Sequence, residues 1–358
     1  MTTLAHYTAL LETVGEAFAV LPLTGDASLL ITQRGGRVLG LFPTPESPNL
    51  FWTSSAFDSP DAFNAFINRT DGWHWNLGGD RVWIAPEITY NVRDRRDFGG
   101  TWAIPRAMDP GSYTLTETDR GIWLSAGLRL QGYQHGNPID SANVLLIRRI
   151  ERTRPPLAEL DPTVLTFGYD QLATLERLDD QPQPLSEVWN LVQLNAGGTL
   201  IIPVIGEVRA SDYVKPVPAF ARQIVNGVLH LPLNGQQQFK IGYKALCMTG
   251  RMGYLHDLPD GRAYLLVRQF FNDPSNLYAE EPPEEPGNTG HSVHVYNDGG
   301  AVDQGRPFGE MECSGHTLGF NDTFVKRAEK RHTFSLWAYV GAREAVREIA
   351  RQLLGSLP

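Results

Sequence analysis

Short apolar segments separated by turn residues run through most of this 358-residue chain. They are rich in β-branched and aromatic residues, which is typical of strands. Ten such segments are 28–33, 36–42, 121–133, 143–153, 198–206, 239–250, 263–271, 291–297, 308–315 and 332–340. Asn226-Gly227 is a strong signal for a two-residue β-hairpin turn. Strands do not alternate with helices along the chain, so we predict an all-β, mainly antiparallel fold and not a doubly wound parallel sheet.

Helical periodicity is confined to a few places. Apolar residues recur every three or four positions over about 3–19 and about 342–354, which predicts a helix near each end. A shorter helix is expected after Ser59, which would be its N-cap, with Pro60 in its first turn. Composition does not change across any linker, so we expect residues 1–358 to form a single β-sandwich domain.

The charge and motif content exclude several classes of function. The net charge is −9, from 40 acidic and 31 basic residues. Nucleic acids and anionic membranes are therefore unfavourable partners, because both are bound mainly through Lys and Arg. There is no phosphate-binding glycine loop, no serine-hydrolase elbow and no apolar segment of membrane-spanning length. The first residues lack the features of a signal peptide, and we expect a cytoplasmic protein.

Two strand-like segments near the end of the chain carry titratable side chains. Alternate residues of a strand share one face, so Glu310 should point the same way as Glu312, and His294 the same way as Tyr296. If these strands form a hairpin, His316 could join the same cluster. Such a group suits acid–base chemistry, because two close carboxylates raise the pKa of one of them. One alternative is that His294, Glu310, Glu312 and His316 bind a divalent cation. The simplest alternative is that these side chains lie on a solvated face of the sheet and have no functional role.

A second set of candidates lies in the first half of the chain. Gly78-Gly79 would let the backbone turn sharply before a strand that begins near Asp80. Alternation in that strand would place Trp83 toward a groove, partly exposed, and Ile84 in the sandwich. Indoles beside charged groups are the expected lining of a sugar site, because sugars present both C–H faces and hydroxyls. The candidate ligand-binding residues here are Trp73, His74, Arg81, Trp83, Glu87, Trp102 and Arg106. Trp123 and Trp337 lie inside apolar strands and are expected in the core.

Several of these segments together resemble a known group of proteins. They are "GGDRVWIAPE", "WAIPRAMDPG", "VWNLVQLNAGGTLIIPV", "FKIGYKA", "SVHVYND" and "FGEMECSGHTL", in this order from about Gly78 to about Trp337. The set is similar to uncharacterised bacterial families of the galactose mutarotase-like superfamily. That resemblance implies a β-supersandwich with a sugar-binding groove on the concave face of one sheet. It also implies a Glu base at Glu310 or Glu312 and a His acid. The N-H-x-x-F-N stretch that supplies one catalytic His in mutarotases has no counterpart here, and His294 stands where relatives often show Glu.

We therefore expect a carbohydrate-active protein with epimerase-like or mutarotase-like chemistry on a mono- or oligosaccharide. Glu312 or Glu310 would be the base and His294 the acid, with Arg81 and Arg106 orienting the ligand. Tyr296 and His316 would contact it as well. No cofactor is expected. The alternatives are a non-catalytic carbohydrate-binding or sensing domain, and a polysaccharide lyase or glycoside hydrolase on the same fold.

Overall fold

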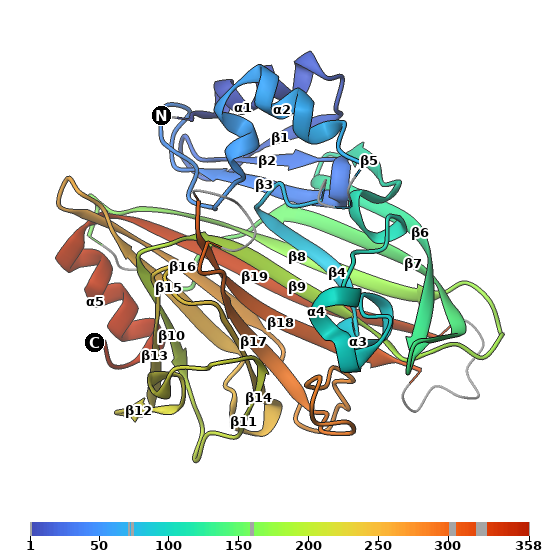
Figure 1. Cartoon of the computed structure of the whole chain (residues 1–358). Helices are drawn as coiled ribbons and strands as arrows, with labels where there is room; N and C mark the ends of the chain where they lie inside the picture. Colours follow the sequence, from blue (N-terminus) through green and yellow to red (C-terminus); the bar gives the residue numbers. More distant parts are fainter. Residues whose placement is uncertain are drawn as a thin grey trace.

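The computed structural model describes residues 2–70, 72, 75–157, 161–300, 306–319 and 328–357. They form two large sheets that pack face to face, with few helices (Figure 1). All neighbouring strands are antiparallel, as the abundance of turns and the lack of crossover helices predict. The predicted all-β supersandwich is therefore confirmed. A division into domains is not tested, and the single domain over 1–358 stays a prediction.

The first sheet carries the candidate site. Within the described residues it has nine strands, in the order β1, β2, β3, β4, β9, β18, β17, β14 and β11. Their bounds are Phe18–Pro22 (β1), Ser28–Thr32 (β2), Arg37–Phe42 (β3), Asp80–Ala85 (β4), Ser186–Asn195 (β9), Phe308–Leu318 (β18), His291–Asn297 (β17), Phe239–Lys244 (β14) and Ala210–Val214 (β11). Strands distant in sequence therefore meet at the centre of this sheet.

The second sheet forms the other layer. In the same part of the chain it has ten strands, in the order β12, β13, β10, β15, β16, β19, β8, β7, β6 and β5. Their bounds are Ile224–Val225 (β12), Val228–Leu233 (β13), Gly198–Pro203 (β10), Arg251–Asp257 (β15), Arg262–Phe270 (β16), Glu329–Ala342 (β19), Leu165–Arg177 (β8), Asn137–Arg152 (β7), Gly121–Gln134 (β6) and Thr114–Glu117 (β5). Asn226-Gly227 joins β12 to β13, and both residues have positive φ, as a tight hairpin turn requires.

The helices are short and peripheral. They are α1 (Leu4–Thr13), α2 (Pro60–Ile67), α3 (Glu87–Tyr90), α4 (Phe98–Thr101) and α5 (Arg343–Leu354), with single turns η1 (Arg34–Gly36), η2 (Ser55–Asp58), η3 (Arg95–Asp97), η4 (Ala107–Gly111), η5 (Ala219–Arg222) and η6 (Ala245–Cys247). The Ser59 hydroxyl accepts from the Ala62 amide and caps α2, as predicted. The first helix is shorter than the expected 3–19: Gly15 takes a positive φ after it, and Phe18 already belongs to β1. None of the helices in the described residues is long and apolar enough to cross a membrane.

Three apolar clusters hold these elements together. The largest fills the space between the sheets and includes Val82 and Met311 from the first sheet and Leu266 and Leu336 from the second. Helices α1 and α2 cover β2 and β3, and α5 lies on the outer side of the second sheet near β15 and β16 (Figure 1). Each fully buried aliphatic side chain of this kind contributes about 1.5–3 kcal/mol.

The two tryptophans expected in the core behave differently. Trp337 is buried beneath α5. Trp123 is 37% exposed, contrary to the prediction, because β6 lies near the edge of its sheet and alternation turns this position outward. The guanidinium of Arg149 on β7 packs 4.3 Å from the Trp123 ring centroid and covers part of it.

Candidate functional site

The candidate site is built on the face of the first sheet that points away from the second. Strand β4 pairs with β9 and β9 pairs with β18, so Arg81, Leu191 and Glu312 lie side by side in register. Strand β17 extends the row, because His294 pairs with Glu312. Alternation then sends Val82 and Ile84 into the sandwich, where both are buried, as predicted.

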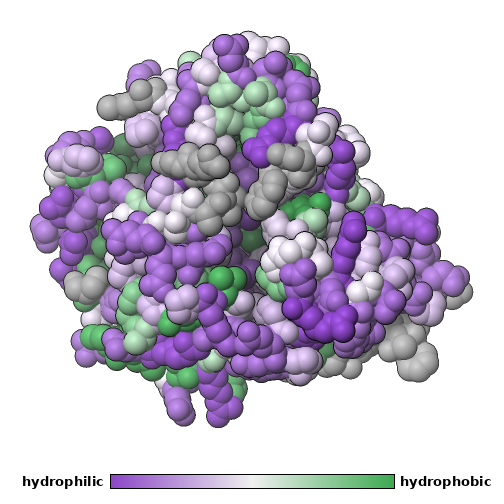
Figure 2. Space-filling view, in the orientation of Figure 1, coloured by the Kyte–Doolittle hydropathy of each residue, from purple (hydrophilic) through white to green (hydrophobic). Residues whose placement is uncertain are grey.

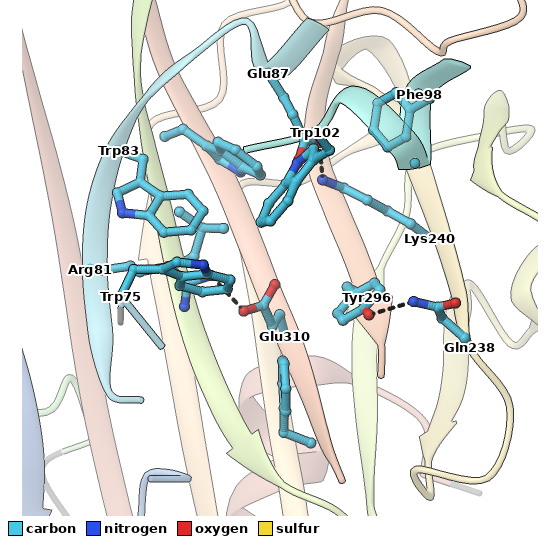
Figure 3. Close-up of a pocket in the computed structure, with 14 residues that line it drawn as sticks. Trp75, Arg81, Trp83, Glu87, Phe98, Trp102, Gln238, Lys240, Tyr296 and Glu310 are labelled. Atoms are coloured by element: carbon cyan, nitrogen blue, oxygen red, sulfur yellow. Dashed lines mark hydrogen bonds and ion pairs between the residues drawn. The ribbon is translucent and has the colours of Figure 1, made fainter. Parts of the chain in front are cut away.

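A pocket of about 220 Å³ opens on this face. Strands of the first sheet form its base, and the segment that carries α3 and α4 forms one wall (Figure 3). We call it the tryptophan pocket, and it is lined by Trp75, Arg81, Trp83, Glu87, Phe98, Gly99, Trp102, Trp189, Leu191, Gln238, Lys240, Tyr296, Phe308 and Glu310. Figure 2 shows this side of the molecule hollowed near its centre, where hydrophobic residues lie among hydrophilic ones.

Arg81 and Glu310 form a buried ion pair in the base of the pocket. Nη2 of Arg81 donates to Oε1 of Glu310 at 2.7 Å, and both side chains are almost fully buried. The guanidinium also lies 4.2 Å from the Trp83 ring centroid and 5.6 Å from that of Trp75. Nε and Nη1 of Arg81 have no hydrogen-bond partner among the described residues. Buried donors of this kind are costly to leave unpaired, so they favour a polar ligand in the pocket.

Lys240 on β14 is the second cation of the pocket. Its Nζ lies 2.8 Å from Oε2 of Glu87, 3.6 Å from Oε2 of Glu312 and 4.4 Å from the Trp189 ring centroid. Burial lowers the pKa of Lys240, but the charges of Glu312, Glu87 and Glu280 outweigh it and raise the pKa above its ordinary value. Lys240 therefore stays a charged hydrogen-bond donor at neutral pH.

Glu87 joins the wall of the pocket to its base. At the start of α3, its Oε1 accepts from Nε1 of Trp102 at 2.7 Å while its Oε2 binds Lys240. Its backbone amide donates to the carboxylate of Glu280, a buried residue of the loop before β17. Trp102 is thereby held over the pocket, as Figure 3 shows.

Glu310 and Glu312 share a face, as predicted, but their surroundings differ. Oε2 of Glu312 accepts from Nε1 of Trp189 at 3.0 Å, and the side chain is fully buried below the pocket. Burial raises the pKa of Glu312 to about 8; Lys240 opposes this shift and Glu310 adds to it. One strand therefore presents a carboxyl with a raised pKa beside another that is paired with a guanidinium.

His294 shares this face, but it is not among the lining residues. Its ring packs at 4.8 Å, edge to face, on that of Tyr213, over Gly242 of β14. A Cβ at Gly242 would lie 2.8 Å from Cδ2 of His294 and 2.5 Å from Cε2 of Tyr213, so only glycine leaves room for both rings. Burial, Lys240 and His291 lower the pKa of His294 well below its ordinary value, so the ring is neutral.

Most of the other predicted residues line the pocket, but some do not. Arg81, Glu87, Trp102, Tyr296 and Glu310 line the pocket together with Trp83. Trp83 was expected to be partly exposed, but it is 2% exposed, because Arg81 packs on its ring and its Nε1 donates to Asp109 at 3.0 Å. Trp73 and His74 lie outside the described residues.

Two predicted residues do not reach the pocket. Arg106 is exposed, because it precedes the η4 turn and the residues of that turn that point inward are Met108 and Asp109. His316 follows a register shift in β18, between Ser314 and Thr317, which breaks the alternation assumed for it. Its Nε2 lies 3.1 Å from Oδ2 of Asp273 instead.

The structure adds pocket residues that the sequence analysis missed. They are Phe98, Gly99, Trp189, Leu191, Gln238, Lys240 and Phe308, and Trp75 of the predicted aromatic segment lines the pocket as well. Alternation in β14 gives the direction of Lys240, since a lysine between Phe239 and Ile241 must point away from the core, but it does not place Lys240 in the pocket. Among the residues that the structure describes, no three His, Cys, Asp or Glu side chains are grouped to hold a metal ion, and the four-residue set proposed for a cation does not assemble.

Comparisons with known proteins give a family and several similar folds. The model of a family described as "Family of unknown function (DUF6786)" matches residues 67–357. No curated protein matches the chain significantly. This family match agrees with the uncharacterised family expected from the sequence motifs.

Three solved structures illustrate the similar folds. One is a protein from Escherichia coli K12 proposed to be an aldose 1-epimerase, with 11% identity and a TM-score of 0.49, over 90% of this chain and 99% of that one. The second is the GalM/aldose epimerase homologue from C. elegans, with 8% identity and a TM-score of 0.40, over 92% and 99%. The third is the 4-alpha-glucanotransferase from Thermococcus litoralis, with 9% identity and a TM-score of 0.33, over 90% of this chain and 39% of that one.

Proposed function

We propose that the chain, which belongs to the family of unknown function DUF6786, binds a carbohydrate in the tryptophan pocket and moves protons on it. The observation that carries this proposal is the Arg81–Glu310 pair with its unused guanidinium donors among indole rings. Aromatic faces suit the C–H faces of a sugar, and fixed charges suit its hydroxyls.

The proposed reaction is epimerase-like or mutarotase-like. The Glu310 carboxylate would take the proton of the C1 hydroxyl, the bond between C1 and the ring oxygen would break, and Lys240 would give a proton to that oxygen. After rotation of the open-chain aldehyde, the same steps in reverse would close the ring on the other face of C1. Lys240 replaces the predicted acid His294 in this scheme, because Lys240 is charged and lines the pocket. Arg81 would orient the hydroxyls from the base of the pocket.

A non-catalytic sugar-binding protein is the second candidate. No imidazole is found among the described residues that line the pocket, and the cation that replaces it releases its proton reluctantly. Binding without turnover needs only the indoles and the fixed charges, so this candidate remains compatible with the geometry.

The decisive experiment follows pure anomers of common aldoses, such as α-glucose and α-galactose, by NMR with and without the protein. We expect faster interconversion with the native protein and a loss of about 100-fold or more in Glu310→Gln, the usual scale for removing a general base. Glu16→Gln is the control, since Glu16 pairs with Arg34 and neither residue lines the pocket. Tryptophan fluorescence is measured in parallel.

Each outcome has one interpretation. Acceleration that Glu310→Gln abolishes supports the enzyme. Quenching by a sugar that remains chemically unchanged supports the binding protein. No quenching and no acceleration with any aldose would show that the pocket does not take carbohydrates.

A further inference from the structure

A second hollow lies next to the tryptophan pocket. It has a volume of about 550 Å³, larger than the pocket itself, and we call it the outer hollow. Phe98 and Tyr213 line it, together with Pro283 and Pro286 of the loop before β17. Arg95 and Lys215 supply charged groups at its edge. The outer hollow, like the tryptophan pocket, therefore combines apolar rings with charged side chains.

The two spaces share walls. Phe98 lines both of them. Tyr213 lines the outer hollow, and its ring centroid lies 5.9 Å from Nζ of Lys240, which lines the pocket. The two spaces are therefore adjacent, and a ligand that extends from the pocket past Phe98 would reach the outer hollow.

Arg95 fixes the shape of the outer hollow. Its Nε donates to the carbonyl of Pro283 at 2.9 Å, Nη2 to that of Pro282 at 2.8 Å, and Nη1 to Oε1 of Glu281 at 2.6 Å. These three bonds tie η3 to the loop before β17, which also lines the outer hollow. A wall held by several charge-assisted bonds is preorganised, which lowers the entropy lost when a ligand binds.

The size of the pocket limits its occupant. Its 220 Å³ is below the roughly 300–1,000 Å³ typical of small-molecule sites. We infer that the pocket takes one sugar unit of an oligosaccharide and that the outer hollow takes the next unit. This inference rests on the proposed carbohydrate function and names its substrate class as oligosaccharides in preference to free monosaccharides.

The test compares matched ligands on the full chain. Affinities are measured by calorimetry for glucose against maltose and cellobiose, for galactose against β-1,4-galactobiose, and for mannose against β-1,4-mannobiose. We expect at least one disaccharide to bind about tenfold tighter than its monosaccharide or more, which corresponds to one further set of contacts. In Arg95→Ala the ratio of the two affinities should fall below about threefold, because the outer wall loses its three bonds.

Arg34→Ala is the matched control. Arg34 is as buried as Arg95 and also pairs with one glutamate, Glu16, but it lies outside both spaces. The ratio of disaccharide to monosaccharide affinity in Arg34→Ala should equal that of the native protein. Equal affinity for monosaccharides and disaccharides, or the same ratio in Arg95→Ala as in Arg34→Ala, would overturn the inference and leave the proposed function intact. Failure of every sugar to bind would overturn both.

Discussion

Arg81 on β4 and Glu310 on β18 form a 2.7 Å ion pair across the intervening strand β9, although 229 residues separate them in sequence. The pair brings the aromatic segment of the first half of the chain against the acidic strand near its end. The base of the tryptophan pocket therefore forms only when these two segments, distant in sequence, come together in the fold. Nε and Nη1 of the Arg81 guanidinium are buried and have no hydrogen-bond partner among the described residues.

A double-mutant cycle tests how much this pair stabilises the fold. Removing one member of a buried pair leaves an uncompensated charge and typically costs about 3–5 kcal/mol. We expect Arg81→Met and Glu310→Leu each to lower the free energy of unfolding by about 3 kcal/mol. The double variant should lose clearly less than the sum of the two, as urea denaturation would show. Strictly additive losses would mean that the two charges do not interact in solution.

The raised pKa of Glu312 makes stability depend on pH. Its pKa is about 8 in the fold, against an ordinary value of 4.5. Between these values the folded state binds more protons than the unfolded chain, so stability falls as pH rises from about 5 to 8. Burial raises the pKa of Glu187 to about 7, which adds a slope of the same sign.

Glu312→Gln should remove the first of these slopes while keeping an acceptor for Nε1 of Trp189. One carboxyl contributes up to about 1.4 kcal/mol per pH unit. Urea unfolding at pH 5, 6, 7 and 8 measures it, with Glu348→Gln as control, because that exposed carboxyl has a lowered pKa and does not titrate in this range. If the free energy of unfolding depended on pH in the same way in the native protein and in Glu312→Gln, the raised pKa of Glu312 would be contradicted.

Strand alternation made much of the candidate site predictable. It predicted that Arg81 lies on one face of its strand and that Val82 and Ile84 lie on the other. It also predicted that Glu310 and Glu312 share a face. These predictions needed only the period of two and no knowledge of the partners. The pairing of β17 with β18, which sets His294 beside Glu312, was only a condition in the sequence analysis, and the structure shows that it is met.

The failures have equally specific causes. The bulge after Ser314 turns His316 away from the pocket, and a register shift of this kind leaves no simple mark in the sequence. Lys240 was missed because its importance comes from β14 lying next to β17, which is a matter of topology. Trp83 was expected to be partly exposed, but Arg81 of the same strand packs on its ring and Asp109 of the η4 turn accepts from its Nε1.

The glycine pair before β4 provides a further prediction. Gly78 has φ of +103°, and a Cβ there would lie 2.3 Å from the carbonyl oxygen of Trp52. Gly78→Ala combines a strained backbone with a clash against main chain, so we expect a loss of more than about 2 kcal/mol. Gly206→Ala is the control: φ is +67° there, and the added methyl group meets nothing within 4 Å. It should cost only the backbone strain, about 1 kcal/mol. Similar thermal melting of the two variants would refute the close approach at Gly78.

Asp80 holds a cluster of buried charges between the two sheets. Its Oδ2 accepts from Nη2 of Arg268 at 2.6 Å, and its Oδ1 lies 3.6 Å from Nη2 of Arg148; all three side chains are fully buried. Within the described part of the chain, no other carboxylate forms an ion pair with either arginine. In this cluster the single carboxylate charge of Asp80 therefore balances two guanidinium charges.

Asp80→Asn keeps the shape of the side chain but leaves two buried guanidinium groups without a counter-ion. We expect a loss of about 3–5 kcal/mol in the free energy of unfolding, a large share of the roughly 5–15 kcal/mol that stabilises a typical domain. Arg268→Leu should cost less, because Arg148 remains to balance Asp80. Asp260→Asn is the exposed comparison: its pair with Arg262 is about half exposed, so we expect a change below about 0.5 kcal/mol. If Asp80→Asn were no more destabilising than Arg268→Leu, charge balance would not be what this cluster provides, and its hydrogen bonds to Asn190 and Tyr169 would account for it instead.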